Sequence, residues 1–173
     1  MRDEDEGGLP PPLQAEQQLD DLLEVRLHSA RVSAEVARVT VELQGRIENF
    51  QPHLHLRGRG MQMEAILPNG TRQVLSLVSD YDFNWHNNYV YADDVAPLLP
   101  KGTVLLFKTW YDNTASRKGN PDPNQWIGWG DRTVDEMGHA WVNVTYLSDD
   151  DFKGEVEKRK AADAESTTGG QQQ

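Results

Sequence analysis

Two histidines separated by one residue are the strongest candidates for chemistry in this sequence. They are His53 and His55, in the segment Gln51-Pro52-His53-Leu54-His55. Side chains alternate between the two faces of an extended strand, so both imidazoles project to the same side and can bind one metal ion. A His-x-His pair is also typical of an ordinary polar sheet face, so the pattern alone leaves both interpretations open.

Three scattered histidines are further candidates. The other histidines are His28, His86 and His139. His86 stands in an Asn-rich segment, where it is either a proton donor or fourth ligand near the metal, or a surface histidine in a turn.

Composition excludes several classes of function. The chain has 173 residues, a net charge of −11 and no cysteine. Phosphate binding needs clustered Lys and Arg, so we expect no nucleic-acid partner, and no apolar run approaches the roughly 20 residues that cross a bilayer, so we expect no membrane partner. The absence of cysteine excludes disulfides and thiolate metal sites.

Short alternating segments separated by turns must position these residues. We predict strands in RVTVEL (38–43), MQMEAIL (61–67), RQVLSLV (72–78), TVLLFKTW (103–110) and AWVNVTY (140–146), with turns at PNG (68–70) and PKG (100–102). Such spacing predicts an all-β, antiparallel β-sandwich of jelly-roll type. We expect most of the five tryptophans in its core, with Trp126 and Trp129 partly exposed.

The two ends of the chain differ in composition from the middle. Residues 1–21 are acidic and Pro-rich, and we predict a disordered or partly helical linker, with a short helix or linker across 13–27. The segment LLEVRLHSARV (22–32) fits an irregular strand pair equally well, so both interpretations stay open there. Residues 22–152 form the predicted sandwich. Residues 153–173 are predicted to be a charged, low-complexity tail that does not order itself.

The order of the segments around these candidates resembles a known enzyme family. PHLHLRGRGM, PNG, PLLPKGTVLLFKTWYDNT and WIGWGDRTVDEMGHAWVNVTY follow one another as in the C-terminal domain of copper type II, ascorbate-dependent monooxygenases. That family includes peptidylglycine α-hydroxylating monooxygenase and dopamine β-monooxygenase. The likeness covers residues 50–146, and bacterial members resemble it more closely through YDFNW, YDN, NPDP and WGDRTVDEM.

The resemblance implies a metal, a co-substrate and a set of ligands. In that family the His-x-His pair and a methionine after Glu bind the oxygen-activating copper, which assigns one copper ion to His53, His55 and Met137, the residue after Glu136. The thioether of Met137 is a soft ligand that favours Cu(I), although a methionine is more often a filler of core space. Dioxygen is then the co-substrate and ascorbate a suitable reductant. The relatives work largely outside the cytoplasm, so a periplasmic or secreted location is expected, although the N-terminus has no export signal.

The sequence departs from the family in two respects. An N-terminal half with a second copper on three histidines is missing, so an electron donor or such a domain must be supplied from outside this chain. The peptide-anchoring positions of the family are here Gln51, His139 and Trp141, so a peptidyl-glycine substrate is not expected. His86, His139, Gln51 and Tyr111 are assigned to the metal surroundings or substrate pocket.

Three functions are compatible with these features. The first is the copper-binding half of a monooxygenase that hydroxylates an activated C–H bond of a small molecule or peptide. The second is a non-catalytic copper-binding or electron-relay module that works with a redox partner. The third is an interaction domain that has kept the scaffold without the metal.

Overall fold

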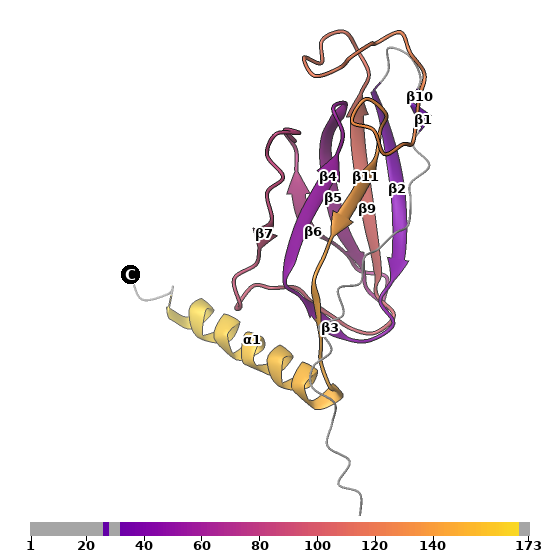
Figure 1. The fold of residues 1–173 in the computed structure, drawn as a ribbon. Coiled ribbons are helices and arrows are strands. Elements are labelled where there is room, and N and C mark those ends of the chain that lie inside the picture. Colours follow the sequence, from indigo (N-terminus) through magenta and orange to yellow (C-terminus); the bar gives the residue numbers. More distant parts are fainter. Residues whose placement is uncertain (1–25, 28–31, 170–173) are drawn as a thin grey trace, which may run out of the picture.

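The chain is mostly β-structure with one C-terminal helix (Figure 1). The structure is a computed structural model that describes residues 26–27 and 32–169. All strand pairs in this part are antiparallel, as predicted, apart from an isolated parallel bridge between Trp129 and Glu136. Figure 1 shows the long strands side by side, with β1 and β10 near one end of the body and α1 at the other.

A four-stranded sheet forms one side of the core. Its strands, in spatial order, are β2 (Val32–Thr40), β9 (Val104–Asp112), β5 (Gly58–Ile66) and β6 (Arg72–Val78). The predicted turn at Pro68-Asn69-Gly70 closes the β5–β6 hairpin, where the Leu67 N–H donates to the Thr71 carbonyl at 2.8 Å. Gly70 has a φ of 84°, a conformation that residues with a Cβ rarely adopt.

Two three-stranded sheets complete the β-structure around the core. The first contains β11 (Gly138–Trp141), β4 (Asn49–Leu54) and β7 (Tyr89–Val90); the second contains β12 (Val144–Tyr146), β3 (Gly45–Ile47) and β8 (Leu98–Leu99). The single strand predicted across 140–146 is therefore wrong. The chain changes partner at Asn143, whose N–H donates to the Asn49 side chain at 2.8 Å.

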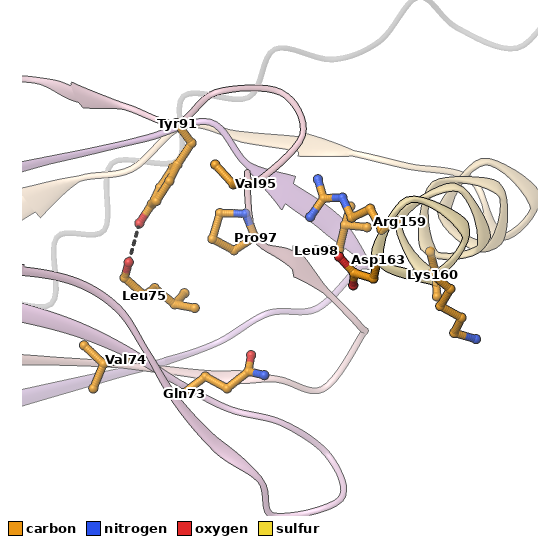
Figure 2. A pocket seen from close by; sticks show the side chains of 11 residues that line it. Gln73, Val74, Leu75, Tyr91, Val95, Pro97, Leu98, Arg159, Lys160 and Asp163 are labelled. Atoms are coloured by element: carbon orange, nitrogen blue, oxygen red, sulfur yellow. Dashed lines mark hydrogen bonds between the residues drawn. The ribbon is translucent and has the colours of Figure 1, made fainter. Parts of the chain in front are cut away.

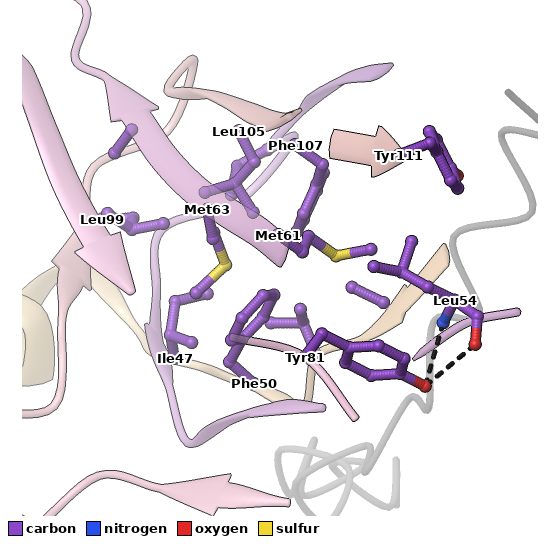
Figure 3. Packing of buried hydrophobic residues seen from close by; sticks show 14 of the residues in the cluster. Ile47, Phe50, Leu54, Met61, Met63, Tyr81, Leu99, Leu105, Phe107 and Tyr111 are labelled. Carbon is purple, nitrogen blue, oxygen red and sulfur yellow. Dashed lines mark hydrogen bonds between the residues drawn. The ribbon is translucent and has the colours of Figure 1, made fainter. Parts of the chain in front are cut away.

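The hydrophobic core joins all three of these sheets (Figure 3). Met61 and Met63 of β5 point inward with Phe107 of β9, and they meet Phe50 of β4 and Ile47 of β3, all of them nearly inaccessible to water. Each such side chain contributes roughly 1.5–3 kcal/mol by leaving water. This shared core holds β4, which carries the His-x-His pair, rigidly against the larger sheet.

The N-terminal part of the chain is a strand where it is described. Of the two interpretations of this segment, the short helix or linker is wrong at Arg26–Leu27, because β1 (Arg26–Leu27) is a strand that pairs with β10 (Ile127–Gly128). The backbone of residues 26–27 gains strand hydrogen bonds from a segment distant in sequence, which helical spacing of leucines does not reveal. The rest of the predicted linker lies outside the described residues.

Helix α1 (Asp149–Gly169) occupies most of the predicted tail. The expectation that residues 153–173 do not order themselves is wrong up to Gly169, whereas a partly helical C-terminal extension is confirmed. The Ser148 side chain caps the helix, since its hydroxyl accepts from the Asp151 N–H at 3.2 Å and donates to the Asp151 carboxylate at 2.6 Å. Three aspartates in the first turn stabilise the helix, because their negative charges lie at the positive end of the helix dipole.

Side-chain pairs one turn apart add to the stability of α1. Glu155 with Lys158 and Glu157 with Lys160 form ion pairs of 2.6 and 2.8 Å. Within the described part of the chain, no helix has the length and apolar character needed to span a bilayer.

Candidate metal centre

The candidate site lies on the outer face of the β4–β11 pair. Pro52 and Leu54 of β4 are buried in the core, whereas Gln51 and His53 alternate with them on the opposite, half-buried face. In the register of the two strands, His139 of β11 lies directly opposite His53. The pairing therefore places two imidazoles from distant parts of the sequence side by side on one face.

His55 and Met137 lie just beyond the ends of the strand pair. The register ends where Leu54 pairs with Gly138, so His55 is the residue after β4 and Met137 is the residue before β11. Met137 is half-buried between two buried neighbours, whereas His55 is only 4% exposed. The fold therefore brings the segments that carry the three residues implied as copper ligands to the same end of the β4–β11 pair.

His53 is the centre of a cluster of imidazole rings. Its ring centroid lies 5.2 Å from that of His55, 4.9 Å from that of His86 and 4.6 Å from that of His139. The nearest approach of ring nitrogens is 3.4 Å, between Nδ1 of His53 and Nδ1 of His86. All histidines among the described residues therefore gather at this one place, and His28 lies outside those residues.

A loop between β6 and β7 brings His86 over the strand pair. Tyr81 is the anchor of this loop, because its hydroxyl donates to the Leu54 carbonyl at 2.9 Å and accepts from the Leu54 N–H at 3.2 Å. The Gln51 side chain donates to the carbonyl of His86 at 3.3 Å. The guanidinium of Arg117, in the loop 113–125, donates a hydrogen bond to the Tyr81 carbonyl at 3.2 Å.

The orientation of His55 is set by the backbone before the methionine. Nδ1 of His55 lies 3.2 Å from the carbonyl oxygen of Asp135, which can only accept a hydrogen bond. The proton must then be on Nδ1, so Nε2 keeps its lone pair. Metal-binding histidines characteristically hold one nitrogen in this way while the other binds the metal.

Burial and crowding keep His53 uncharged. Desolvation, together with smaller contributions from charge repulsion by His139, His55 and His86, lowers the pKa of its imidazole from 6.5 to about 4. A neutral imidazole offers the lone pair that a metal ion needs.

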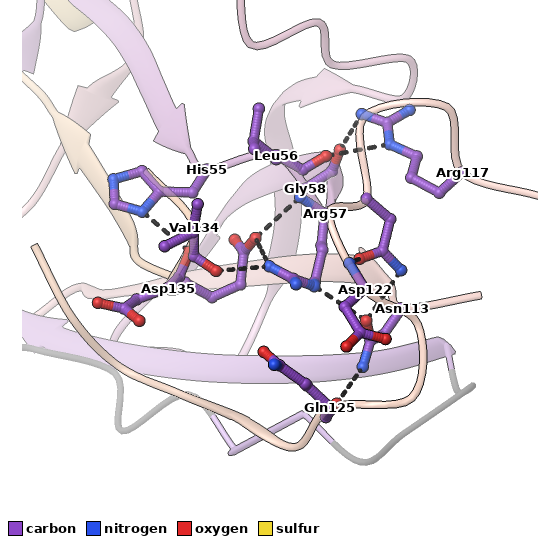
Figure 4. A network of polar contacts seen from close by, with 12 residues as sticks. His55, Leu56, Arg57, Gly58, Asn113, Arg117, Asp122, Gln125, Val134 and Asp135 are labelled. Carbon is purple, nitrogen blue, oxygen red and sulfur yellow. Dashed lines mark hydrogen bonds and ion pairs between the residues drawn. The ribbon is translucent and has the colours of Figure 1, made fainter. Parts of the chain in front are cut away.

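Beneath the histidines, a buried network ties the two ligand-bearing segments together (Figure 4). Arg57 and Glu136 are 1% and 0% exposed. The Arg57 N–H donates to Glu136 Oε1 at 2.8 Å, and its guanidinium lies 3.5 Å from the same oxygen. The guanidinium also donates to Asn113 Oδ1 and to the Val134 carbonyl, each at 2.9 Å.

The position of this network in the sequence explains its importance for the site. Arg57 follows His55 by two residues, and Glu136 immediately precedes Met137. Burial raises the pKa of Glu136 to about 7, while Arg57 opposes that shift. The sequence did not predict that Arg57 and Glu136 form a buried ion pair. The only indication was that each charged residue stands within two positions of an assigned ligand.

Tyr111 does not belong to the histidine face. It is fully buried in the core on β9, and its hydroxyl lies so close to Gly138 that a Cβ there would collide with it. Desolvation raises the pKa of this hydroxyl. Tyr111 thus reaches β11 from the core side, beside the residue that follows Met137, and its assignment to the metal surroundings remains a prediction.

The tryptophans also differ from the prediction. None lies in the core: Trp85, Trp126 and Trp129 are 68%, 67% and 39% exposed, and Trp110 and Trp141 are half-buried. Exposure of Trp126 and Trp129 was expected and is confirmed. Trp141 belongs to the site, since its ring lies 4.3 Å from that of His139 and 5.6 Å from that of His53.

The residues gathered here fit a copper ion in donor chemistry. Imidazole and thioether together suit both oxidation states of copper. As the side chains lie, no three His, Cys, Asp or Glu side chains of the described ranges surround a common binding point. Binding by three residues therefore requires a change of side-chain torsions, at the half-buried His53 and Met137 and at the buried His55.

A hollow elsewhere in the molecule has no such chemistry. A hollow of about 430 Å³ lies beside α1 and is lined by Leu75 and Tyr91 on the sheet side and by Arg159 and Lys160 of the helix (Figure 2). None of the four clustered histidines lines it. The imidazole face is therefore the better candidate for a functional site.

Comparison of the sequence with models of protein families and with curated proteins finds no match.

Proposed function

We propose that this chain binds one copper ion through His53, His55 and Met137 and serves as the copper-binding half of a dioxygen-dependent monooxygenase. The reaction is hydroxylation of an activated C–H bond with a reductant such as ascorbate. The sheets are, in this proposal, the β-sandwich of the C-terminal domain of copper type II monooxygenases. The observation that carries the proposal is the gathering of four imidazoles at the end of the β4–β11 pair, where Met137 immediately precedes β11.

Each residue has a distinct task in this proposal. Copper, when bound, supplies the one-electron chemistry that activates dioxygen. His53 offers a neutral imidazole, and the Asp135 carbonyl orients His55 so that its Nε2 faces away from the backbone. The Arg57–Glu136 pair keeps the His55 and Met137 segments at a constant separation.

The number of histidines supports a single copper rather than two. Every described histidine is already part of the one cluster. A complete hydroxylation needs electrons that one copper ion does not store, so a donor or a second copper domain outside this chain has to supply them. This observation also favours a second candidate function, a non-catalytic copper-binding or electron-relay module that works with a redox partner.

Copper content and affinity test the site. We expect one copper per chain by metal analysis after loading with Cu(II) and removal of free metal. His53→Ala should weaken Cu(II) binding more than Met137→Ala does, and Met137→Ala should matter more for Cu(I), because the thioether is the softer ligand. Asn87→Ala, an exposed neutral change near the cluster, is the control. Equal copper binding by wild type and both site variants would refute the assignment.

Oxygen consumption separates the two candidate functions. With copper, ascorbate and a candidate electron partner, the monooxygenase half should consume oxygen in a manner that His53→Ala abolishes. A relay module should instead bind copper and exchange electrons with the partner without sustained oxygen consumption.

A further inference from the structure

We propose that His86 is an additional ligand of the same metal ion, so that the loop between β6 and β7 completes a site with three imidazoles. The proposal rests on the copper site proposed above and goes beyond its ligand set of two histidines and a methionine. His86 stands on a different element from the other ligands and is exposed to solvent. Metal binding would thus connect this loop to the β4–β11 pair.

The distance between two ring nitrogens carries the inference. Two imidazole nitrogens that bind one ion at about 2.0–2.1 Å with a tetrahedral angle lie about 3.3 Å apart. Nδ1 of His53 and Nδ1 of His86 are 3.4 Å apart. A direct hydrogen bond between these nitrogens would be long, since N–H donors usually approach their acceptors to about 2.9–3.0 Å.

The loop is built so that His86 is held at this distance. Its anchor Tyr81 bonds to both backbone groups of Leu54, the residue between His53 and His55. Two residues later Phe83 packs against both His55 and His86, with ring centroids 6.3 and 5.3 Å away.

A local turn completes the approach of this loop to the strands. The Asp82 carboxylate accepts a hydrogen bond from the Asn84 N–H at 2.9 Å, which stabilises a turn in the chain just before His86. The contacts of Tyr81, Asp82 and Phe83 together fix the position of His86 relative to His53 more firmly than a solvent-exposed turn requires.

His139 contacts His53 in a different manner. Their rings are tilted by only 30° at 4.6 Å, and the other side of the His139 ring meets Trp141 edge-on at 4.3 Å. This arrangement is that of packed rings rather than of two ligands converging on one ion. We therefore assign the additional ligand to His86, and His139 to the wall of the site.

A third imidazole changes which oxidation state the site prefers. Nitrogen ligands hold Cu(II) well, whereas the Met137 thioether favours Cu(I). Loss of His86 should therefore weaken the binding of Cu(II) more than the binding of Cu(I). Loss of Met137 should have the opposite effect. This difference separates a ligand role for His86 from a general disturbance of the site.

The experiment measures copper affinity and coordination on the full chain. Cu(II) affinity is determined by competition with a chelator, and electron paramagnetic resonance of the Cu(II) form reports the bound nitrogens. We expect His86→Ala to lower the affinity for Cu(II) at least tenfold and the affinity for Cu(I) by less. The variant should also change the nitrogen hyperfine pattern. Asn87→Ala and His139→Ala should leave that pattern unchanged, and circular dichroism checks that each variant folds.

The outcomes distinguish this inference from the proposed function. If wild type binds copper and His53→Ala abolishes binding, while His86→Ala leaves affinity and spectrum unchanged, the ligand role of His86 is refuted and the copper site stands. If His139→Ala alone removes a nitrogen, His139 is the ligand and the assignment to His86 is wrong. If wild type binds no copper, both proposals fail.

Discussion

The two sides of the β4–β11 strand pair differ in how their polar groups are satisfied. On the outer side, His53 contacts His55, His86 and His139 mainly through its ring, and its Nδ1 lies 3.4 Å from His86 Nδ1, which is long for a hydrogen bond. On the inner side, Arg57 bonds to Glu136, Asn113 and Val134 in full burial. The inner side is thus a stable support, and the outer side is a set of donors that gains most from a ligand.

The largest effect is expected from breaking the inner side. Arg57→Ala leaves the buried Glu136 carboxyl without its main partner and should lower the free energy of unfolding by about 3–5 kcal/mol, measured by urea denaturation. Arg132→Ala is the matched control, because its pair with Asp135 is exposed to solvent and should contribute little to the free energy of unfolding. Similar stabilities of the two variants would contradict the supporting role of Arg57.

The outer side should show the reverse behaviour, with little effect on the metal-free protein. Without metal, His53→Ala should change the free energy of unfolding by less than about 1 kcal/mol, because the ring is half-exposed. Copper at a hundred times its dissociation constant should stabilise wild type by about 2.7 kcal/mol, and His53→Ala should lose most of that gain. Thermal unfolding with and without copper measures both quantities. An unchanged melting temperature of the wild type in the presence of copper would contradict the idea that the outer side gains stability from a ligand.

The boundary between the two sides is tightest at Gly138. A Cβ at this position would collide with the Tyr111 hydroxyl, so Gly138→Ala should cost about 1–3 kcal/mol of the free energy of unfolding. Tyr111→Phe removes the colliding atom, and the double variant should therefore recover part of the loss. Chemical denaturation of the two single variants and the double variant gives the coupling. Strict additivity would show that the two residues do not compete for the same space.

The sequence predicted one half of this arrangement much better than the other. Alternation in PHLHL was sufficient to place His53 and His55 on one side of a strand. The register that sets His139 against His53 depends on pairing between distant strands, and local pattern contains no information about it. The approach of His86 depends on Tyr81 reaching Leu54, a tertiary contact. Arg57 and Glu136 were missed because charged residues next to a motif suggest solvent, not mutual burial.

Titration distinguishes the two sides by sign, although the effect is the smallest. The folded pKa of His53 is about 4 against 6.5 unfolded, so between these values the unfolded state binds more protons and stability falls as the pH falls. Glu136 behaves oppositely, because its raised pKa favours the protonated native state between 4.5 and about 7, and stability falls as the pH rises.

We expect each effect to be about 1 kcal/mol after allowance for solvent and for the buried partner. Urea denaturation at several pH values, compared with His53→Ala and Glu136→Gln, isolates the two contributions as differences. The advantage of wild type over His53→Ala should shrink from pH 7 to pH 4, because protonation of His53 then opposes folding. Its advantage over Glu136→Gln should grow over the same range as the buried carboxyl becomes neutral. Parallel pH profiles for the three proteins would contradict the separation of the two sides.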